Sequence, residues 1–204
     1  LNFFFYFISY YIHLYTLMCF SLEVSISTFV VSWGISIYLL NKGLVKWKKQ
    51  NVIFLMLFST IQIADAILWY NNMEHNNINY IITSYVIPLI LSLQLVYNIF
   101  VRNNNKNHLI TILAIIFIIY TFYRFNGYSK SLCNNNLSSP IWGSKEIELW
   151  ELVLFALVVI YPEYDVILFT FTYFFLIKIV VGGAYGSLWC AIGNILALYY
   201  LFTY

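Results

Sequence analysis

Long runs of apolar residues separated by short polar segments make up most of this chain. A helix that crosses a membrane needs about 20 predominantly apolar residues, within a range of about 17–25. The stretches that meet or approach this length are residues 22–40, 52–70, 79–101, 108–124, 148–161, 166–182 and 184–203. The pattern therefore predicts an all-α membrane protein folded as a seven-transmembrane-helix bundle, with no β-strand.

The fifth stretch is the weakest of the seven. It is short, and Pro162 ends it because proline cannot donate a backbone hydrogen bond within a helix. Apolar stretches of about 10–14 residues can be re-entrant. Residues 148–161 and 166–182 therefore form either two spans or one hairpin that dips into the membrane. Both alternatives return the chain to the same side, so the direction of the last helix does not change.

Composition supports the membrane class and excludes others. Hydrophobic residues make up 62% of the chain and charged residues 9%, whereas a soluble domain carries roughly 25% charged residues. The net charge of +2 comes from ten basic and eight acidic residues, too few to neutralise a row of nucleic-acid phosphates. The expected partner is the lipid bilayer, with no nucleic acid, and the oligomeric state is left open.

The lysines and arginines predict the orientation, because short cytoplasmic loops are enriched in them. The first and third loops hold six basic residues, against three at the opposite face: Lys42, Lys46, Lys48, Lys49, Arg102 and Lys106 against Arg124, Lys130 and Lys145. This predicts an amino end that is outside or lumenal and a cytoplasmic carboxyl end. The sequon Asn136-Leu137-Ser138 falls in a loop that this topology places outside.

Four charged residues fall within the predicted spans, all in their outer half: Glu23, Asp65, Glu151 and Lys178. Charges inside a membrane are costly and usually face the bundle interior or a partner. At the helical rise, Asp65 and Lys178 lie about 20 and 18 Å above the inner face. We expect them to lie within pairing reach, with Glu23 and Glu151 as rival partners of Lys178. No charge is expected in the inner half of any span.

Uncharged polar residues repeat at helical spacing, which stacks side chains on one face. One stripe of hydroxyls runs through Ser21, Ser25, Thr28, Ser32 and Ser36. Similar faces combine Gln62 with Asp65 and Trp69, and Ser187 with Cys190 and Asn194. These residues form either hydrogen bonds between helices or a polar pocket that opens outward. The candidate ligand-binding or ion-pair residues are Glu23, Gln62, Asp65, Lys178, Ser187, Cys190 and Asn194.

Other chemistry has little support. His13, His75 and His108 are scattered, so no metal site is predicted. Cys190 has no histidine in the membrane that could serve as its base, and no cofactor is expected. Cys19 and Cys133 both fall on the outer face, where a disulfide can form in an oxidising compartment.

One resemblance adds to this interpretation. Met18-Cys19-Phe20-Ser21, the segment from Gln62 to Trp69, and Gly186-Ser187-Leu188-Trp189-Cys190 with Asn194 resemble an uncharacterised family of small multi-pass membrane proteins, which is associated with large DNA viruses and protists. The resemblance implies membrane residence. It also implies that residues 18–204 are one domain that starts at Met18 and that residues 1–17 are a spurious upstream segment. If they belong to the protein, residues 1–17 are apolar enough for an extra helix.

The expected function is the binding of a small solute or ion by the polar cluster in the outer half of the bundle, in a transporter-like protein or a sensor. The alternative is a structural or assembly protein of the membrane whose polar residues only lock helices together. An intramembrane enzyme is the least expected class.

Overall fold

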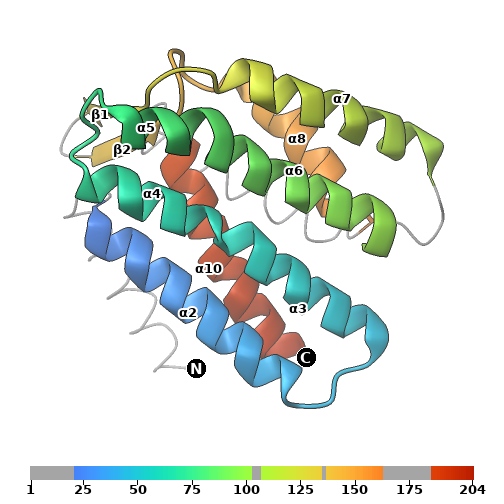
Figure 1. The fold of residues 1–204 in the computed structure, drawn as a ribbon. Helices are drawn as coiled ribbons and strands as arrows, with labels where there is room; N and C mark the ends of the chain where they lie inside the picture. Colours follow the sequence, from blue (N-terminus) through green and yellow to red (C-terminus); the bar gives the residue numbers. More distant parts are fainter. Residues whose placement is uncertain (1–20, 103–106, 135–136, 163–184) are drawn as a thin grey trace.

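The computed structural model describes residues 21–102, 107–134, 137–162 and 185–204. The fold is mostly helical, in agreement with the predicted class (Figure 1). The helices are α2 (Leu22–Leu40), α3 (Lys46–Ser59), α4 (Ile61–Tyr70), α5 (Asn77–Ile81), η1 (Ile82–Val86), α6 (Ile87–Tyr97), η2 (Asn98–Arg102), α7 (His108–Arg124), α8 (Leu149–Ile160) and α10 (Tyr185–Thr203). Two short strands, β1 (Lys130–Asn134) and β2 (Leu137–Ile141), lie between α7 and α8.

Three helices are long and apolar enough to cross a membrane: Leu22–Leu40, Lys46–Tyr70 and Asn77–Arg102. Shorter apolar helices cover His108–Arg124, Leu149–Ile160 and Ile192–Thr203. The predicted helix over residues 166–182 lies outside the described residues. A count of seven spans therefore stays a prediction.

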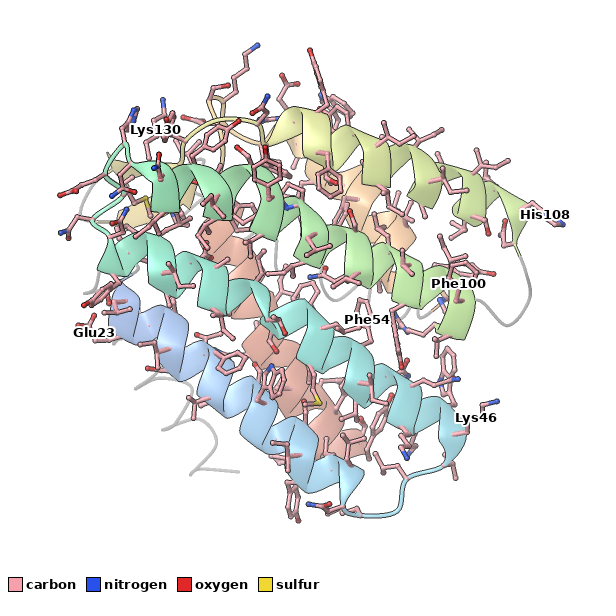
Figure 2. The ribbon with its side chains drawn as sticks, viewed as in Figure 1. Glu23, Lys46, Phe54, Phe100, His108 and Lys130 are labelled. Carbon is pink, nitrogen blue, oxygen red and sulfur yellow. The ribbon has the colours of Figure 1, made fainter. Side chains whose placement is uncertain are left out.

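The helical stretches Leu22–Leu40, Lys46–Tyr70, Asn77–Arg102 and His108–Arg124 run in alternating directions between two ends of the bundle (Figure 1). Glu23 and Lys130 lie at one end, which we call the hairpin end, and Lys46 and His108 lie at the other, the lysine end (Figure 2). The first connection and the residues that flank the third therefore lie at the same end, and the side of the membrane that this end faces stays a prediction.

The second span begins earlier than expected and contains a local break. Its helix starts at Lys46 and not at residue 52, because lysines at a helix end can extend their charge away from an apolar surface. The break at Thr60 separates α3 from α4. There the hydroxyls of Ser59 and Thr60 donate to the carbonyls of Leu55 and Met56, at 2.8 and 2.7 Å. Such bonds to a preceding turn often bend a helix.

The third span contains two π-helical turns. Pro88 lacks an N–H and cannot complete the α-helical pattern, and η1 ends at Val86, two residues before it. The second π-turn, η2, ends the span at Arg102. Both turns carry buried polar side chains, among them Thr83 and Asn98.

The β-hairpin contradicts the expectation that the chain contains no strand. β1 and β2 pair antiparallel, with Lys130 opposite Ile141 and Asn134 opposite Leu137. At its base the side chain of Asn79 binds the backbone of Ser129: its amide nitrogen donates to the Ser129 carbonyl at 2.9 Å, and its oxygen accepts the Ser129 N–H at 2.8 Å. A contact with a distant helix thus anchors the hairpin, and no local hydrophobic pattern reveals it.

The distribution of side chains is inverted relative to a soluble protein. Many polar residues of the long helices are buried, including Ser25, Thr28, Ser32, Ser36, Asn51, Gln62, Asp65, Gln94, Asn98 and Arg102. Large apolar side chains are exposed on the outside of the same helices, including Val30, Ile37, Ile63, Leu89, Leu93, Ile112, Ile116 and Ile119. α2 packs against α3, α4 and α10, and α6 packs against α3 and α7.

Candidate functional site

One face of α4 gathers the polar residues that the sequence singled out in the second span. Gln62 and Asp65 are each 1% exposed, and Trp69 is partly buried. The indole N–H of Trp142 donates to the carboxylate of Asp65 at 2.8 Å. In contrast, Oε1 of Gln62 and Nε1 of Trp69 are buried and have no hydrogen-bond partner in the described part of the chain. Buried polar atoms are nearly always paired, so this face retains unused capacity to bind.

The charged residues predicted to surround Lys178 have other described contacts. Lys178 lies outside the described residues, so its pairing with Asp65 stays a prediction. Glu151 forms an ion pair with Arg124, with 2.8 Å between Oε1 and Nε. Glu23 is exposed at the start of α2, where it accepts a hydrogen bond from the hydroxyl of Ser21 at 2.5 Å.

Asn194 belongs to a separate group of residues, between α10 and α2. Its amide nitrogen donates to the hydroxyl of Thr28 and its oxygen accepts from that of Ser32, both at 3.2 Å. The hydroxyl stripe of α2 is buried from Ser25 to Ser36. The side chains of Ser187 and Cys190 lie outside the described part of the chain. Asn194 thus bonds to two positions of α2 one turn apart and links two helices.

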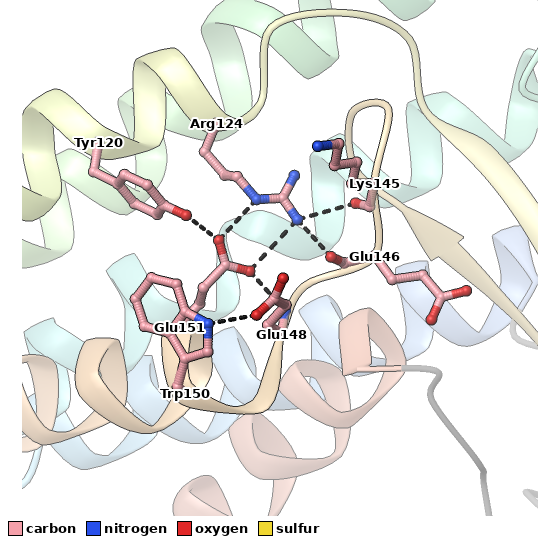
Figure 3. Close-up of polar contacts among 7 residues, drawn as sticks. All are labelled: Tyr120, Arg124, Lys145, Glu146, Glu148, Trp150 and Glu151. Carbon is pink, nitrogen blue, oxygen red and sulfur yellow. Dashed lines mark hydrogen bonds and ion pairs between the residues drawn. The ribbon is translucent and has the colours of Figure 1, made fainter.

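A second cluster, at the hairpin end, joins the ends of α7 and α8 (Figure 3). The carboxylate of Glu151 accepts hydrogen bonds from the Tyr120 hydroxyl, from Arg124, and from the backbone N–H of Glu148 at 2.6 Å. The last bond is half of a capping box that starts α8. Arg124 also donates to the carbonyls of Lys145 and Glu146, at 3.1 and 2.6 Å. The guanidinium therefore holds the segment before α8 against the end of α7.

A small, partly open pocket lies beside this cluster, with a volume of about 50 Å³. α6, α7, α8 and the segment between the hairpin and α8 contribute its lining: Leu91, Phe117, Tyr120, Thr121, Arg124, Phe125, Trp142, Ile147, Glu151, Leu152 and Phe155. The surface that these residues offer is almost entirely apolar. One guanidinium nitrogen of Arg124, Nη1, is buried and has no hydrogen-bond partner among the residues that the structure describes.

Trp142 connects the pocket with the polar face of α4. Its ring lines the pocket and packs edge-on against Phe125, with 5.9 Å between ring centroids, while its N–H binds Asp65. Sequence analysis did not find Trp142, because the tryptophan lies 77 positions from its partner and carries no periodic signal. It did find Glu151, but not its pairing with Arg124. Both residues fall at the outer ends of consecutive predicted helices, which could have suggested the pair.

A third polar cluster, at the lysine end, corrects the expectation that no charge lies in the inner part of a span. Arg102 was assigned to a loop, yet it is 1% exposed and belongs to η2. Its guanidinium donates to Asn51 at 3.1 Å, to Asn98 at 3.2 Å and to the carbonyl of Val159 at 3.0 Å. It also lies over the ring of Phe54, at 4.2 Å. Arg102 thus joins α3, η2 and α8.

Among the residues that the structure describes, no group of three His, Cys, Asp or Glu side chains could hold a metal ion. Comparison of the chain with protein-family models, with curated proteins and with solved structures finds no match. The resemblance to a family of small viral and protist membrane proteins stays a prediction. The functional argument depends on the geometry alone.

Proposed function

We propose that this protein is a multi-pass integral membrane protein that binds a small polar solute or a monovalent cation on the face of α4 formed by Gln62, Asp65 and Trp69. Membrane residence is supported by the three long apolar helices. It is also supported by the inverted arrangement of buried polar and exposed apolar side chains, which is stable only when the surroundings are apolar.

One observation supports binding more than any other: the side-chain oxygen of Gln62 is buried, and no described residue donates a hydrogen bond to it. Leaving such an acceptor unpaired costs roughly 1–3 kcal/mol. The carboxylate of Asp65 lies one turn further along the same helix face. The unpaired oxygen of Gln62 beside the carboxyl group of Asp65 favours a ligand that carries hydrogen-bond donors or positive charge. The indole N–H of Trp69 can donate a hydrogen bond to an acceptor atom of the same ligand.

Thermal unfolding of the purified chain in detergent tests this proposal. We would compare sodium, potassium and choline chloride at equal ionic strength, and then a panel of amino acids and polyols. At least one of these ligands should raise the Tm of the wild-type chain and leave Gln62→Leu unshifted. Gln94→Leu is the matched control, because Gln94 is also buried with an unpaired Oε1 but lies in α6. It should keep the full shift.

The opposite outcome is equally clear. If no ligand shifts the wild-type Tm, or if Gln62→Leu responds as the wild type does, the polar face is not a binding site.

The alternative function is a structural or assembly role in the membrane, in which polar residues only lock helices together. The bonds of Asn194 to Thr28 and Ser32 favour it. Replacing an unpaired buried polar group by an apolar one is neutral or stabilising. If the role is purely structural, Gln62→Leu should therefore be at least as stable as the wild type, and no ligand should change the Tm of either chain.

A further inference from the structure

We propose a second ligand site: the pocket between α6, α7 and α8 binds part of an acyl chain of a phospholipid with a zwitterionic headgroup, in the leaflet at the hairpin end. This inference depends on membrane residence, which is part of the proposed function. It does not depend on the polar face of α4.

The size and surface of the pocket indicate what can enter it. Its volume of about 50 Å³ is roughly one third of the 150 Å³ of a cavity known to bind benzene. A drug-sized solute therefore does not fit, whereas a short length of hydrocarbon does. Phe117, Leu152 and Phe155 supply apolar walls, so an acyl chain would lose little by leaving the bilayer.

The position of the pocket gives a chain access from the lipid. α7 exposes Ile116 and Ile119 along its outer side, and the next turns of this helix line the pocket. Tyr123 and Trp150 flank the hairpin end with 82% and 51% of their surfaces exposed. Tyrosine and tryptophan are enriched at the level of lipid headgroups. We therefore expect the pocket to lie at the depth where the headgroups meet the hydrocarbon.

The rim carries charges of both signs, which favours a zwitterionic head over an anionic one. Lys145, Glu146 and Glu148 are exposed around the Arg124–Glu151 pair (Figure 3). Together the five residues carry a formal charge of −1 (two basic and three acidic), so a net anionic lipid is disfavoured. The phosphate of a zwitterionic headgroup can lie near Lys145 while the ammonium of the same headgroup lies near Glu146 and Glu148.

Photocrosslinking tests this proposal in the full chain. Phosphatidylcholine with a diazirine on its acyl chain would be added to the protein in detergent, and labelled peptides identified by mass spectrometry. Labels should fall on residues 117–125 and 147–155, and excess unlabelled phosphatidylcholine should compete at least several-fold better than phosphatidylglycerol. Inorganic phosphate and choline chloride should not compete, which distinguishes a lipid from its separate head components.

Two variants sharpen the test. Leu152→Trp fills the pocket and should abolish the localised label, whereas Ile119→Trp adds the same side chain on the exposed face of α7 and should keep it. If Leu152→Trp does not fold, Glu148→Gln replaces it and should reduce the preference for phosphatidylcholine over phosphatidylglycerol.

Labels spread evenly over the exposed helices, or equal competition by both lipids, would overturn the proposal. That result would not affect the proposal for Gln62. A protein that stays monodisperse without detergent would contradict membrane residence, and with it both proposals.

Discussion

The indole N–H of Trp142 donates to the buried carboxylate of Asp65 at 2.8 Å, across 77 positions of sequence. This bond fixes the segment after the β-hairpin onto the second span. It also places the ring of Trp142 in the wall of the pocket. The carboxylate that the sequence singled out as a candidate ligand thus also positions a pocket residue.

Removing the N–H of Trp142 should destabilise the protein. In Trp142→Phe the buried carboxyl group of Asp65 loses a hydrogen-bond donor, which costs about 1–3 kcal/mol. Trp150→Phe is the matched control, because its N–H binds the exposed Glu148 and its loss should cost little. Chemical unfolding in detergent measures both. Equal stability of Trp142→Phe and wild type would show that the bond contributes nothing.

Regular periodicity made part of this fold predictable. The spacing of Thr28 and Ser32, and of Gln62 and Asp65, placed them correctly on inward faces. The residues of each pair are about one helical turn apart, so both polar side chains lie on the same face of the helix and are buried away from the lipid. The hairpin, the start of α3 and the buried Arg102 could not be predicted. Asn79 holds the hairpin through a contact that is distant in sequence. Asn51 and the carbonyl of Val159 hold Arg102 in the same way. The start of α3 could not be predicted because a lysine-rich segment such as Lys46–Gln50 is compatible with a loop and with the first turn of a helix.

Arg102 should tolerate no conservative replacement. Arg102→Lys keeps the charge but loses the planar fork that reaches Asn51, Asn98 and the Val159 carbonyl while covering Phe54. We expect a loss of at least about 2 kcal/mol, because buried donors and acceptors are left unpaired. Lys46→Arg, at an exposed position of the same end, should have no effect. Unchanged thermal stability of Arg102→Lys in detergent would contradict this account of the cluster.

Asn194 should couple energetically to α2. Hydrogen bonds between membrane helices average about 0.6 kcal/mol and reach about 1.7. A double-mutant cycle between Asn194→Ala and Thr28→Val should give a coupling energy in this range. Ser27→Ala, on the exposed side of α2, is the control and should give none. Additive effects at Thr28 and Asn194 would show that the two side chains do not interact.

The orientation of the bundle can be tested with single cysteines in a chain whose Cys19, Cys133 and Cys190 are replaced by serine. A cysteine at Lys46 should react with an impermeant maleimide only after the membrane is permeabilised. A cysteine at Lys130, at the opposite end, should react in intact cells. Asn136, the first residue of the sequon, should be glycosylated when the chain is made in a eukaryotic cell. Labelling at Lys46 in intact cells would reverse the predicted topology.

Gly143 should be the least replaceable of three comparable glycines. Its φ of +79° is unfavourable for other residues, and an added Cβ would lie 3.3 Å from the carbonyl oxygen of Arg124 and from Cα of Phe125. Gly143→Ala should therefore combine backbone strain of about 1–3 kcal/mol with a shift of the neighbouring Trp142 away from Asp65. Gly43 separates the two effects, because its φ is +68° but its Cβ position is open. Gly43→Ala should show the strain alone.

Gly34 completes the series, since it lies within α2 with nothing near its Cβ position and no positive φ. Gly34→Ala should be neutral or stabilise by up to about 1 kcal/mol. Unfolding free energies in detergent should thus fall in the order Gly34→Ala, Gly43→Ala, Gly143→Ala. Tryptophan fluorescence should change in Gly143→Ala alone, because that substitution displaces Trp142. A Gly143→Ala variant as stable as Gly43→Ala, with unchanged fluorescence, would show that the contact with Arg124 and Phe125 does not position Trp142 against Asp65.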